Sequence, residues 1–236
     1  MVKNTTPNGI LLVDKPPGMT SHDVVDAMRR RFRIKKVGHC GTLDPNATGL
    51  LILVLGKATK LSEKLMGQDK VYTGVIELGR ETNSYDIDGE VVAEKEVPTL
   101  SMDELNDLCK GFKGDQMQVP PMVSAIKKDG VPLYKLARKG IEIERPPRLI
   151  HIYYFRIKSY SKPDCEFEIA CTKGTYVRSL AHDLGQKIGC GALLKTLRRT
   201  VSGDFKISEA TPLDDILAWN TSKLESALLP PSLPQP

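Results

Sequence analysis

The chain has 236 residues, of which 40% are hydrophobic and 27% are charged. These proportions are ordinary for a globular protein with a core, and they exclude a chain that is disordered over most of its length. The longest apolar run, Leu50 to Leu55, is far shorter than the ~20 residues of a membrane span. Residues 3–7 do not lead into the apolar stretch of a secretory signal. We therefore expect a cytoplasmic protein with no membrane partner.

The net charge of +5 is unevenly distributed along the chain. It is +6 over residues 1–80, −7 over residues 81–118, +9 over residues 119–206 and −3 over residues 207–236. Two basic blocks around an acidic block are typical of proteins with a polyanionic partner. A set of solvated helix faces explains the same pattern, so charge alone leaves both interpretations open.

The cysteines predict neither a metal site nor disulfides. The five are Cys40, Cys109, Cys165, Cys171 and Cys190. They are widely spaced, and the sequence holds no Cys-x-x-Cys pair and no His-x-x-x-His pair. Zinc sites need clustered ligands, so we expect no metal. Reduced and mostly buried thiols fit a cytoplasmic protein.

The pattern of the first 80 residues predicts strands that alternate with helices. Thr20 and Asp23 form a capping-box pattern that opens a helix, and cations crowd the end of this helix. A glycine-rich loop at 38–49 leads directly into an apolar strand. The other expected elements are a strand at 9–13, the apolar strand at 50–55, a helix at 57–65 and a strand at 71–78 that contains Tyr72.

Beyond residue 80 the pattern changes to longer strands and two capped helices. Ser101 and Glu104 cap one helix, and Gly189 ends another that begins near Tyr176. The expected strands are at 151–159 and 165–172, and the basic cluster at 194–199 is either a strand rim or a loop. Residues 116–148 show no clear periodicity and are expected to form a long connection. A single mixed domain of helices and strands accounts for this order.

Asp44 is the first candidate for chemistry. It lies in the glycine-rich loop directly before Pro45, where a fixed turn aims the carboxylate and glycines allow a ligand to approach the backbone. The same residues also suit an ordinary turn in which aspartate binds its own backbone. The local pattern leaves both roles open.

Arg178 is the second candidate, since it falls in the first turn of a helix, where the helix dipole disfavours a cation. A carboxylate or phosphate partner would stabilise it there, and a buried Asp–Arg pair would keep the aspartate ionised. A surface arginine that points away is the alternative. Tyr72 is either a packed strand aromatic or an acid–base group, and His39 faces either solvent or a ligand.

Seven segments of the chain share their order and spacing with one enzyme family. They are Asp14-Lys15-Pro16-Pro17-Gly18-Met19-Thr20-Ser21, Gly38-His39-Cys40-Gly41-Thr42-Leu43-Asp44-Pro45, Lys70-Val71-Tyr72, Gln118-Val119-Pro120-Pro121 with Ser124-Ala125-Ile126-Lys127, Tyr134 with Ala137-Arg138-Lys139-Gly140, Gly174-Thr175-Tyr176-Val177-Arg178, and Gly191-Ala192-Leu193-Leu194 with Leu197-Arg198-Arg199. With these motifs the sequence resembles the TruB family of tRNA pseudouridine synthases over about residues 9–215.

The resemblance implies an enzyme that isomerises uridine 55 in the T-loop of tRNA to pseudouridine, without metal or cofactor. It implies that Asp44 is the catalytic aspartate, that Arg178 pairs with its carboxylate, and that Tyr72 lies against the target base and assists proton transfer. Together with the basic blocks, which would supply phosphate contacts, it gives the expected substrate-binding residues as His39, Lys15, Gly41, Thr42, Arg29, Arg30, Arg31, Lys127 and Arg138. Among these, His39 would hold the flipped-out nucleotide and Lys15 would support the active-site loop.

The implied fold is α+β, with a mixed, largely antiparallel sheet flanked by helices. The catalytic domain would cover residues 1–215, with a thumb-like insertion near 119–148, followed by a C-terminal tail at 216–236 and no PUA module. We expect a monomer that acts on the T-arm of tRNA and needs no guide RNA.

Two other functions compete with this expectation. One is the catalytic subunit of a particle directed by a guide RNA, and the other is an RNA-binding chaperone without catalysis. The joint presence of Asp44, Tyr72 and Arg178 argues against the chaperone, because binding alone requires none of these three residues.

Overall fold

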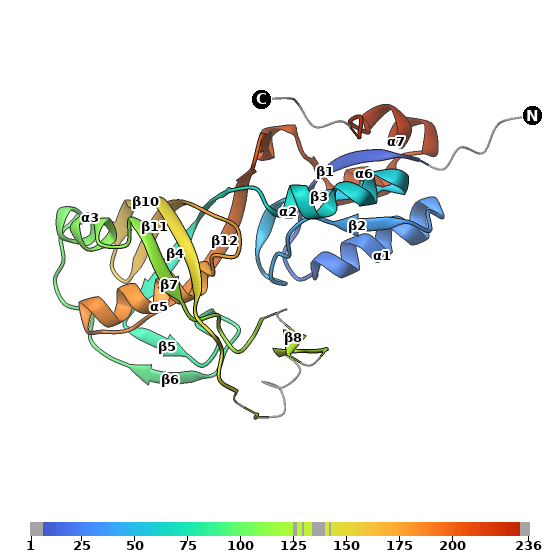
Figure 1. Cartoon of the computed structure of the whole chain (residues 1–236). Coiled ribbons are helices and arrows are strands. Elements are labelled where there is room, and N and C mark those ends of the chain that lie inside the picture. The colour runs from blue at the N-terminus through green and yellow to red at the C-terminus, as the bar shows by residue number, and fades with distance from the viewer. Residues whose placement is uncertain (1–6, 125–126, 129, 134–139, 142, 232–236) are drawn as a thin grey trace, which may run out of the picture. The chain divides into compact units, whose positions relative to one another are not determined.

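The computed structural model describes residues 7–124, 127–128, 130–133, 140–141 and 143–231 (Figure 1). The chain divides into two compact units. The terminal unit contains Met1–Lys70 and Arg198–Pro236, and the central unit contains Val71–Leu197. The boundaries fall near the start of one strand and within another, so each unit has its own sheet segment and its own core.

The terminal unit is built on an antiparallel pair of apolar strands. Strand β1 (Gly9–Lys15) pairs with β3 (Thr48–Leu55) in the register Ile10–Val54. Short strands β2 (Val37–His39) and β14 (Thr211–Pro212) add to β3 and β1, and the end of β12 (Ala192–Ser202) adds parallel to β3. The remaining elements are helix α1 (Ser21–Phe32), the 3₁₀ turn η1 (Gly56–Leu61), helix α2 (Ser62–Met66), strand β13 (Phe205–Lys206), the 3₁₀ turn η2 (Ile207–Glu209), and helices α6 (Leu213–Ala218) and α7 (Thr221–Ala227).

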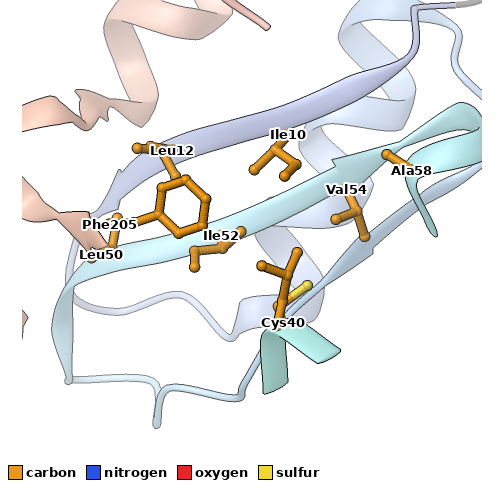
Figure 2. Packing of buried hydrophobic residues seen from close by; sticks show 9 residues of the cluster. Ile10, Leu12, Cys40, Leu50, Ile52, Val54, Ala58 and Phe205 are labelled. Atoms are coloured by element: carbon orange, nitrogen blue, oxygen red, sulfur yellow. The ribbon is translucent and has the colours of Figure 1, made fainter. Parts of the chain in front are cut away.

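Strand β3 is apolar on both faces because both faces are covered. Alternate side chains of β1 and β3 point to one cluster, in which Ile10, Leu12, Ile52 and Val54 gather with Cys40 at the edge (Figure 2). Phe205 from β13 and Leu65 from α2 complete this cluster. The intervening residues of β3 point to the opposite face and are also buried. A run of six apolar residues therefore predicts a central strand, as the sequence indicates.

Helix α1 begins where the capping pattern places it. The Thr20 hydroxyl accepts a hydrogen bond from the Asp23 amide at 3.0 Å, and the Asp23 carboxylate accepts one from the Thr20 amide at 2.8 Å. Its apolar side chains, Val24, Val25, Met28 and Phe32, are buried, and the helix contacts β2 and α6 (Figure 1). The capping box and the apolar spacing together fix both the start and the buried face of α1.

The central unit contains the segment β12–β4–β11–β10–β7 of the sheet. Its strands are β4 (Lys70–Leu78), β7 (Gly114–Gln118), β10 (Arg148–Ser161) and β11 (Asp164–Cys171), with hairpins β5 (Arg80–Thr82)–β6 (Val91–Glu94) and β8 (Lys127–Lys128)–β9 (Val131–Pro132). The pairs β10–β11 and β10–β7 are antiparallel. Helix α3 (Met102–Lys110) contacts β10 and also α5 (Val177–Ile188).

The expected α+β class is confirmed: among the described strand pairs, antiparallel ones such as β1–β3 and β10–β11 occur beside the parallel pairs β1–β14 and β12–β3, and helices flank the strands. In the described part of the chain, no helix combines the length and the apolar character that a membrane span requires.

Three expectations differ from the structure. Residues 116–148, expected as a long connection, include the end of β7, the pair β8–β9 and the first residue of β10. Residues 57–65, expected as one helix, form η1 followed by α2. The segment 216–236, expected as a tail, contains the end of α6 and all of α7. Leu224 of α7 is fully buried, and Leu229 exchanges backbone hydrogen bonds of 2.9 and 3.0 Å with Ile10. A helix this short has little apolar periodicity, so tertiary packing decides its formation.

Candidate active site

Asp44 lies in the terminal unit, in the loop that joins β2 to β3, and is half-buried. The loop begins at Gly41, whose φ of +92° is a left-handed conformation that favours glycine. The Ala47 amide donates to the Asp44 carbonyl at 3.1 Å, and the Gly18 amide donates to the Pro45 carbonyl at 3.0 Å. Residues 44–47 thus form a backbone turn, and a second loop, at residues 16–19, lies against it.

Lys15 joins these two loops. Its side chain is fully buried, and Nζ donates to the carbonyl oxygens of Pro16 at 2.8 Å, Met19 at 2.6 Å and Pro45 at 2.9 Å. Burial lowers the pKa of Lys15 to about 8, although the nearby carboxylates of Asp44 and Asp23 act in the opposite direction. Lys15 thus fastens the Asp44 loop to residues 16–19, and its expected role in an active site stays a prediction.

Two further residues hold the Asp44 loop by its backbone, and the sequence analysis did not assign either of them to the site. Ser21 Oγ accepts from the Leu43 amide at 2.9 Å and donates to the Leu43 carbonyl at 3.2 Å. Arg199 is 1% exposed, and its guanidinium donates to the carbonyls of Leu50 at 2.7 Å and Gly41 at 3.1 Å. Arg199 belongs to the basic cluster at 194–199. The sequence does not show that its side chain points from β12 into the protein.

His39 ends β2 directly before this loop. Its Nδ1 is buried and has no hydrogen-bond partner among the described residues. Burial lowers the pKa of His39, and the positive charges of Arg199 and His22 add to the effect. A neutral ring therefore dominates at neutral pH, which suits a hydrogen bond to an uncharged ligand. Thr42 is exposed in the same loop.

Cys40, between His39 and Gly41, is a packing residue. Its side chain is fully buried in the core cluster, and burial raises the pKa of its thiol to about 11 (Figure 2). Burial also raises the pKa of Cys109 and Cys165 to about 12. Such thiols are weak nucleophiles. Within the described ranges, His, Cys, Asp and Glu side chains form no group of three or more that could hold a metal ion.

Arg178 lies in the central unit, in the first turn of α5, and is 3% exposed. Its Nη1 donates to the Ser84 carbonyl at 3.2 Å and lies 3.3 Å from Asp86 Oδ2, while Nη2 donates to the Val123 carbonyl at 2.8 Å. The alternative of a surface arginine that points away is therefore wrong. Asp86, which the sequence analysis did not single out, is an acidic residue against this guanidinium.

Tyr72 lies in β4 of the central unit and is 9% exposed. This burial agrees with a packed strand aromatic and does not oppose a role beside the target base. The expected pairing of Asp44 with Arg178 joins residues of different units, and it stays a prediction.

The basic residues expected at the RNA surface differ in their contacts. Arg29 Nη2 donates to the Val37 carbonyl at 2.8 Å, and Arg31 donates to the carbonyls of Leu217, at 2.6 Å, and Trp219. Both guanidiniums thus bind neighbouring elements of the terminal unit, although Arg31, like Arg30, is exposed on α1. The backbone of Lys127 belongs to β8, and its side chain lies outside the described residues, as does all of Arg138.

The family is evident from comparison with known proteins. Residues 29–177 match the TruB family pseudouridylate synthase N-terminal domain, and residues 178–232 match the tRNA pseudouridylate synthase B C-terminal domain. The tRNA pseudouridine synthase B of Opitutus terrae is 53% identical over 94% of this chain and 92% of that protein. The corresponding protein of Syntrophotalea carbinolica is 49% identical over 89% of this chain and 68% of that protein.

A solved Cbf5-Nop10-Gar1 complex contains a chain with the same fold, with a TM-score of 0.75 and 29% identity. The match covers 95% of this chain and 60% of that one. The fold is therefore that of the pseudouridine synthases, as expected from the resemblance. The chain belongs to the TruB family of pseudouridylate synthases.

Proposed function

We propose that this protein isomerises uridine 55 in the T-loop of tRNA to pseudouridine, with Asp44 as the catalytic carboxylate and without metal or cofactor. The observation that carries the proposal is the Asp44 loop of a TruB family chain, which Lys15, Ser21 and Arg199 fasten through its backbone. A carboxylate on a fixed loop is pre-organised for one reaction geometry. The relatives named above act on tRNA, which supports the same substrate here.

The proposed chemistry breaks the C–N glycosidic bond of the uridine and forms a C–C bond to the same ribose. The reaction is an isomerisation, so it consumes no oxidant, reductant or second substrate. The carboxylate of Asp44 must be ionised in order to add to C6, attack C1′ or remove a ribose proton. An Asp44–Arg178 pair would keep it so, because a neighbouring guanidinium favours the charged form of a carboxylate.

The target base is stacked within the folded T-loop and must leave the stack before reaction, at a cost of a few kcal/mol. We propose that His39 holds the extruded nucleotide and that Tyr72 lies against its base. Phosphate contacts would come from basic residues such as Arg30, which is exposed on α1. The thumb-like insertion near 119–148, part of which lies outside the described residues, would close over the RNA.

The test is pseudouridine formation on an unmodified T-arm stem-loop with the purified chain alone. Product is read by carbodiimide treatment and primer extension. We expect product from the wild type and a loss of activity of at least about 1,000-fold in Asp44→Asn, because the nucleophile or base is removed. Asp204→Asn, at an exposed aspartate in the turn between β12 and β13, is the matched control and should retain full activity.

The same assay separates the competing functions. A catalytic subunit directed by a guide RNA would leave the isolated T-arm unmodified until a guide and partner proteins were added. The observation that favours this second function is the similarity to the chain in the Cbf5-Nop10-Gar1 complex. If the protein were an RNA chaperone, the wild type and Asp44→Asn would bind the T-arm equally well, and neither would form pseudouridine. Product from Asp44→Asn at the wild-type rate would contradict the role of this aspartate.

A further inference from the structure

The turn at residues 82–86 of the central unit presents two acceptors to Arg178. Thr82 Oγ1 donates to the Asp86 carbonyl at 2.7 Å, and Ser84 Oγ donates to Asp86 Oδ1 at 2.5 Å. The Asp88 amide also donates to Oδ1, at 3.2 Å. Hydrogen bonds within the turn therefore occupy Oδ1 and orient Oδ2, which lies 3.3 Å from Arg178 Nη1.

Tyr85, between these two acceptors, has a backbone conformation that tyrosine rarely adopts. Its φ is +65°, in the left-handed region. Such a conformation costs about 1–3 kcal/mol and persists where surrounding contacts impose it. Here the Tyr85 amide donates to the Thr82 carbonyl at 3.2 Å, and the Tyr85 carbonyl accepts from the Leu194 amide at 2.9 Å.

The ring of Tyr85 stacks on His182, with ring centroids 4.1 Å apart and an interplanar angle of 19°. His182 lies four residues after Arg178 on α5, so both side chains emerge from the same face of the helix. His182 Nδ1 is buried, has no hydrogen-bond partner in the described part of the chain and is 3.8 Å from Glu81 Oε2. The contacts described for the imidazole are therefore the stack on Tyr85 and the approach to Glu81.

We propose that His182 is a positioning residue: its stack on Tyr85 holds the 82–86 turn so that Ser84 and Asp86 orient the Arg178 guanidinium. Helix α5 would then contact the turn at two points, through the Arg178 hydrogen bonds and through the His182 ring. The inference rests on the proposed function, in which Arg178 keeps the catalytic carboxylate ionised. A ring that merely adds stability to α5 is the structural alternative.

Single-turnover kinetics on a saturating T-arm stem-loop test the inference. His182→Ala should lower the rate of the chemical step by about 5- to 10-fold, the equivalent of one lost stacking contact, with substrate affinity unchanged. His182→Phe keeps a stacking ring and should stay within about twofold of the wild type. Tyr85→Gly keeps the left-handed backbone but removes the ring, so its rate should match that of His182→Ala.

Lys187→Ala is the matched control. It removes another contact between α5 and an aromatic ring, because the Lys187 ammonium lies 4.1 Å from the centre of the Phe112 ring, and neither residue belongs to the 82–86 turn. It should keep the wild-type rate. The decisive comparison uses Asp86→Ala: if His182 acts through Asp86, His182→Ala lowers the rate no further in that background.

Each other outcome overturns a specific statement. An inactive wild type contradicts the proposed function, whereas an active wild type with an equally active His182→Ala contradicts only the positioning role. If the rate losses of His182→Ala and Asp86→Ala multiply in the double variant, the His182 ring acts through helix stability instead. The same holds if Lys187→Ala loses as much rate as His182→Ala. Thermal unfolding of all variants, measured alongside, separates a lower rate from a lower folded fraction.

Discussion

At the scale of single residues, the terminal unit depends on two buried cations that bind carbonyl oxygens. Lys15 and Arg199 are 0% and 1% exposed, and every hydrogen-bond acceptor described for them is a backbone carbonyl. Burying a cation is costly unless its donors are satisfied. Carbonyls of a loop can satisfy them only in one arrangement, so the two cations specify the path of the Asp44 loop.

The lowered pKa of Lys15 predicts a pH dependence of stability. In the folded protein this pKa is about 8, below the ordinary value of 10.5, so the unfolded chain binds more protons between these two pH values. The Lys15 contribution should therefore become more favourable as pH rises from about 8 to about 10.5. Relative to Lys15→Met, the free energy of unfolding should rise by about 2–3 kcal/mol across this range.

Urea unfolding of the wild type and Lys15→Met at pH 7.5, 9 and 10.5 measures this difference. The difference between the two proteins cancels the titration of other groups that they share. A difference that stays constant with pH would contradict the lowered pKa.

At the scale of elements, both helix starts that the sequence predicts from capping boxes are confirmed. The box at Thr20 and Asp23 opens α1, and the box at Ser101 and Glu104 opens α3. In each box the hydrogen bonds to the carboxylate lower its pKa. Caps are readable from sequence because their geometry is local, within four residues.

Thr20→Ala should lower the free energy of unfolding by about 1 kcal/mol, since it leaves an amide of the first turn without its acceptor. Ser101→Ala, at the equivalent position of α3, is a second case with the same expected size. Because the folded pKa of Asp23 is below its ordinary value of 3.8, the contribution of its carboxylate is present at neutral pH, begins to decrease near pH 3.8 and is lost as pH falls through the lower folded pKa. Urea titrations at pH 7 and pH 3.5 measure the free energy of unfolding of the wild type and of Thr20→Ala. Equal stability of the two proteins at pH 7 would contradict the capping contribution.

Helix α7 offers a second prediction at this scale. Leu224 is fully buried, so Leu224→Ala should lower the free energy of unfolding by about 3 kcal/mol. Glu225→Ala, at the exposed neighbouring position, should change it by less than about 0.5 kcal/mol. Equal and small effects of the two variants in urea unfolding would mean that α7 is dispensable for the core of the terminal unit.

At the scale of the whole molecule, the charge blocks of the sequence are only partly available to a partner. In the first block, Arg29 and Arg31 bind carbonyl oxygens of β2 and α6, and Arg31 is exposed, as are Arg30 and Lys35. The acidic block, at residues 81–118, includes the carboxylate of Asp86 against Arg178. A count of charges along the chain therefore overestimates the number of cations that can contact phosphates.

Arg30→Gln combined with Lys35→Gln should weaken binding to tRNA and reduce the slope of log affinity against log salt by about one to two. Lys110→Gln combined with Lys113→Gln removes the same charge from exposed positions of the acidic block and should leave the slope unchanged. Filter binding between about 50 and 200 mM salt measures both pairs. If the two pairs have the same effect, the first basic block has no specific role in RNA binding.

The sequence by itself determined what depends on local or strictly periodic patterns. The capping boxes, the apolar strand at 50–55, the left-handed glycine after α5 and the family motifs around Asp44 and Arg178 are all of this kind. The family match over residues 29–177 confirms the resemblance that these motifs carry. Each of these features is specified by residues a few positions apart, whose preferences add along the chain.

The tertiary structure alone decided which distant groups meet. Arg199 reaches Gly41 across 158 positions, Arg178 reaches Ser84 across 94, and Leu229 pairs with Ile10 to hold the last helix on the terminal unit. None of these contacts has a local signature, because a buried guanidinium or a short helix is stabilised by partners that only the fold supplies. The sequence thus identified the family and its candidate residues, and the fold decided which of those residues support the site.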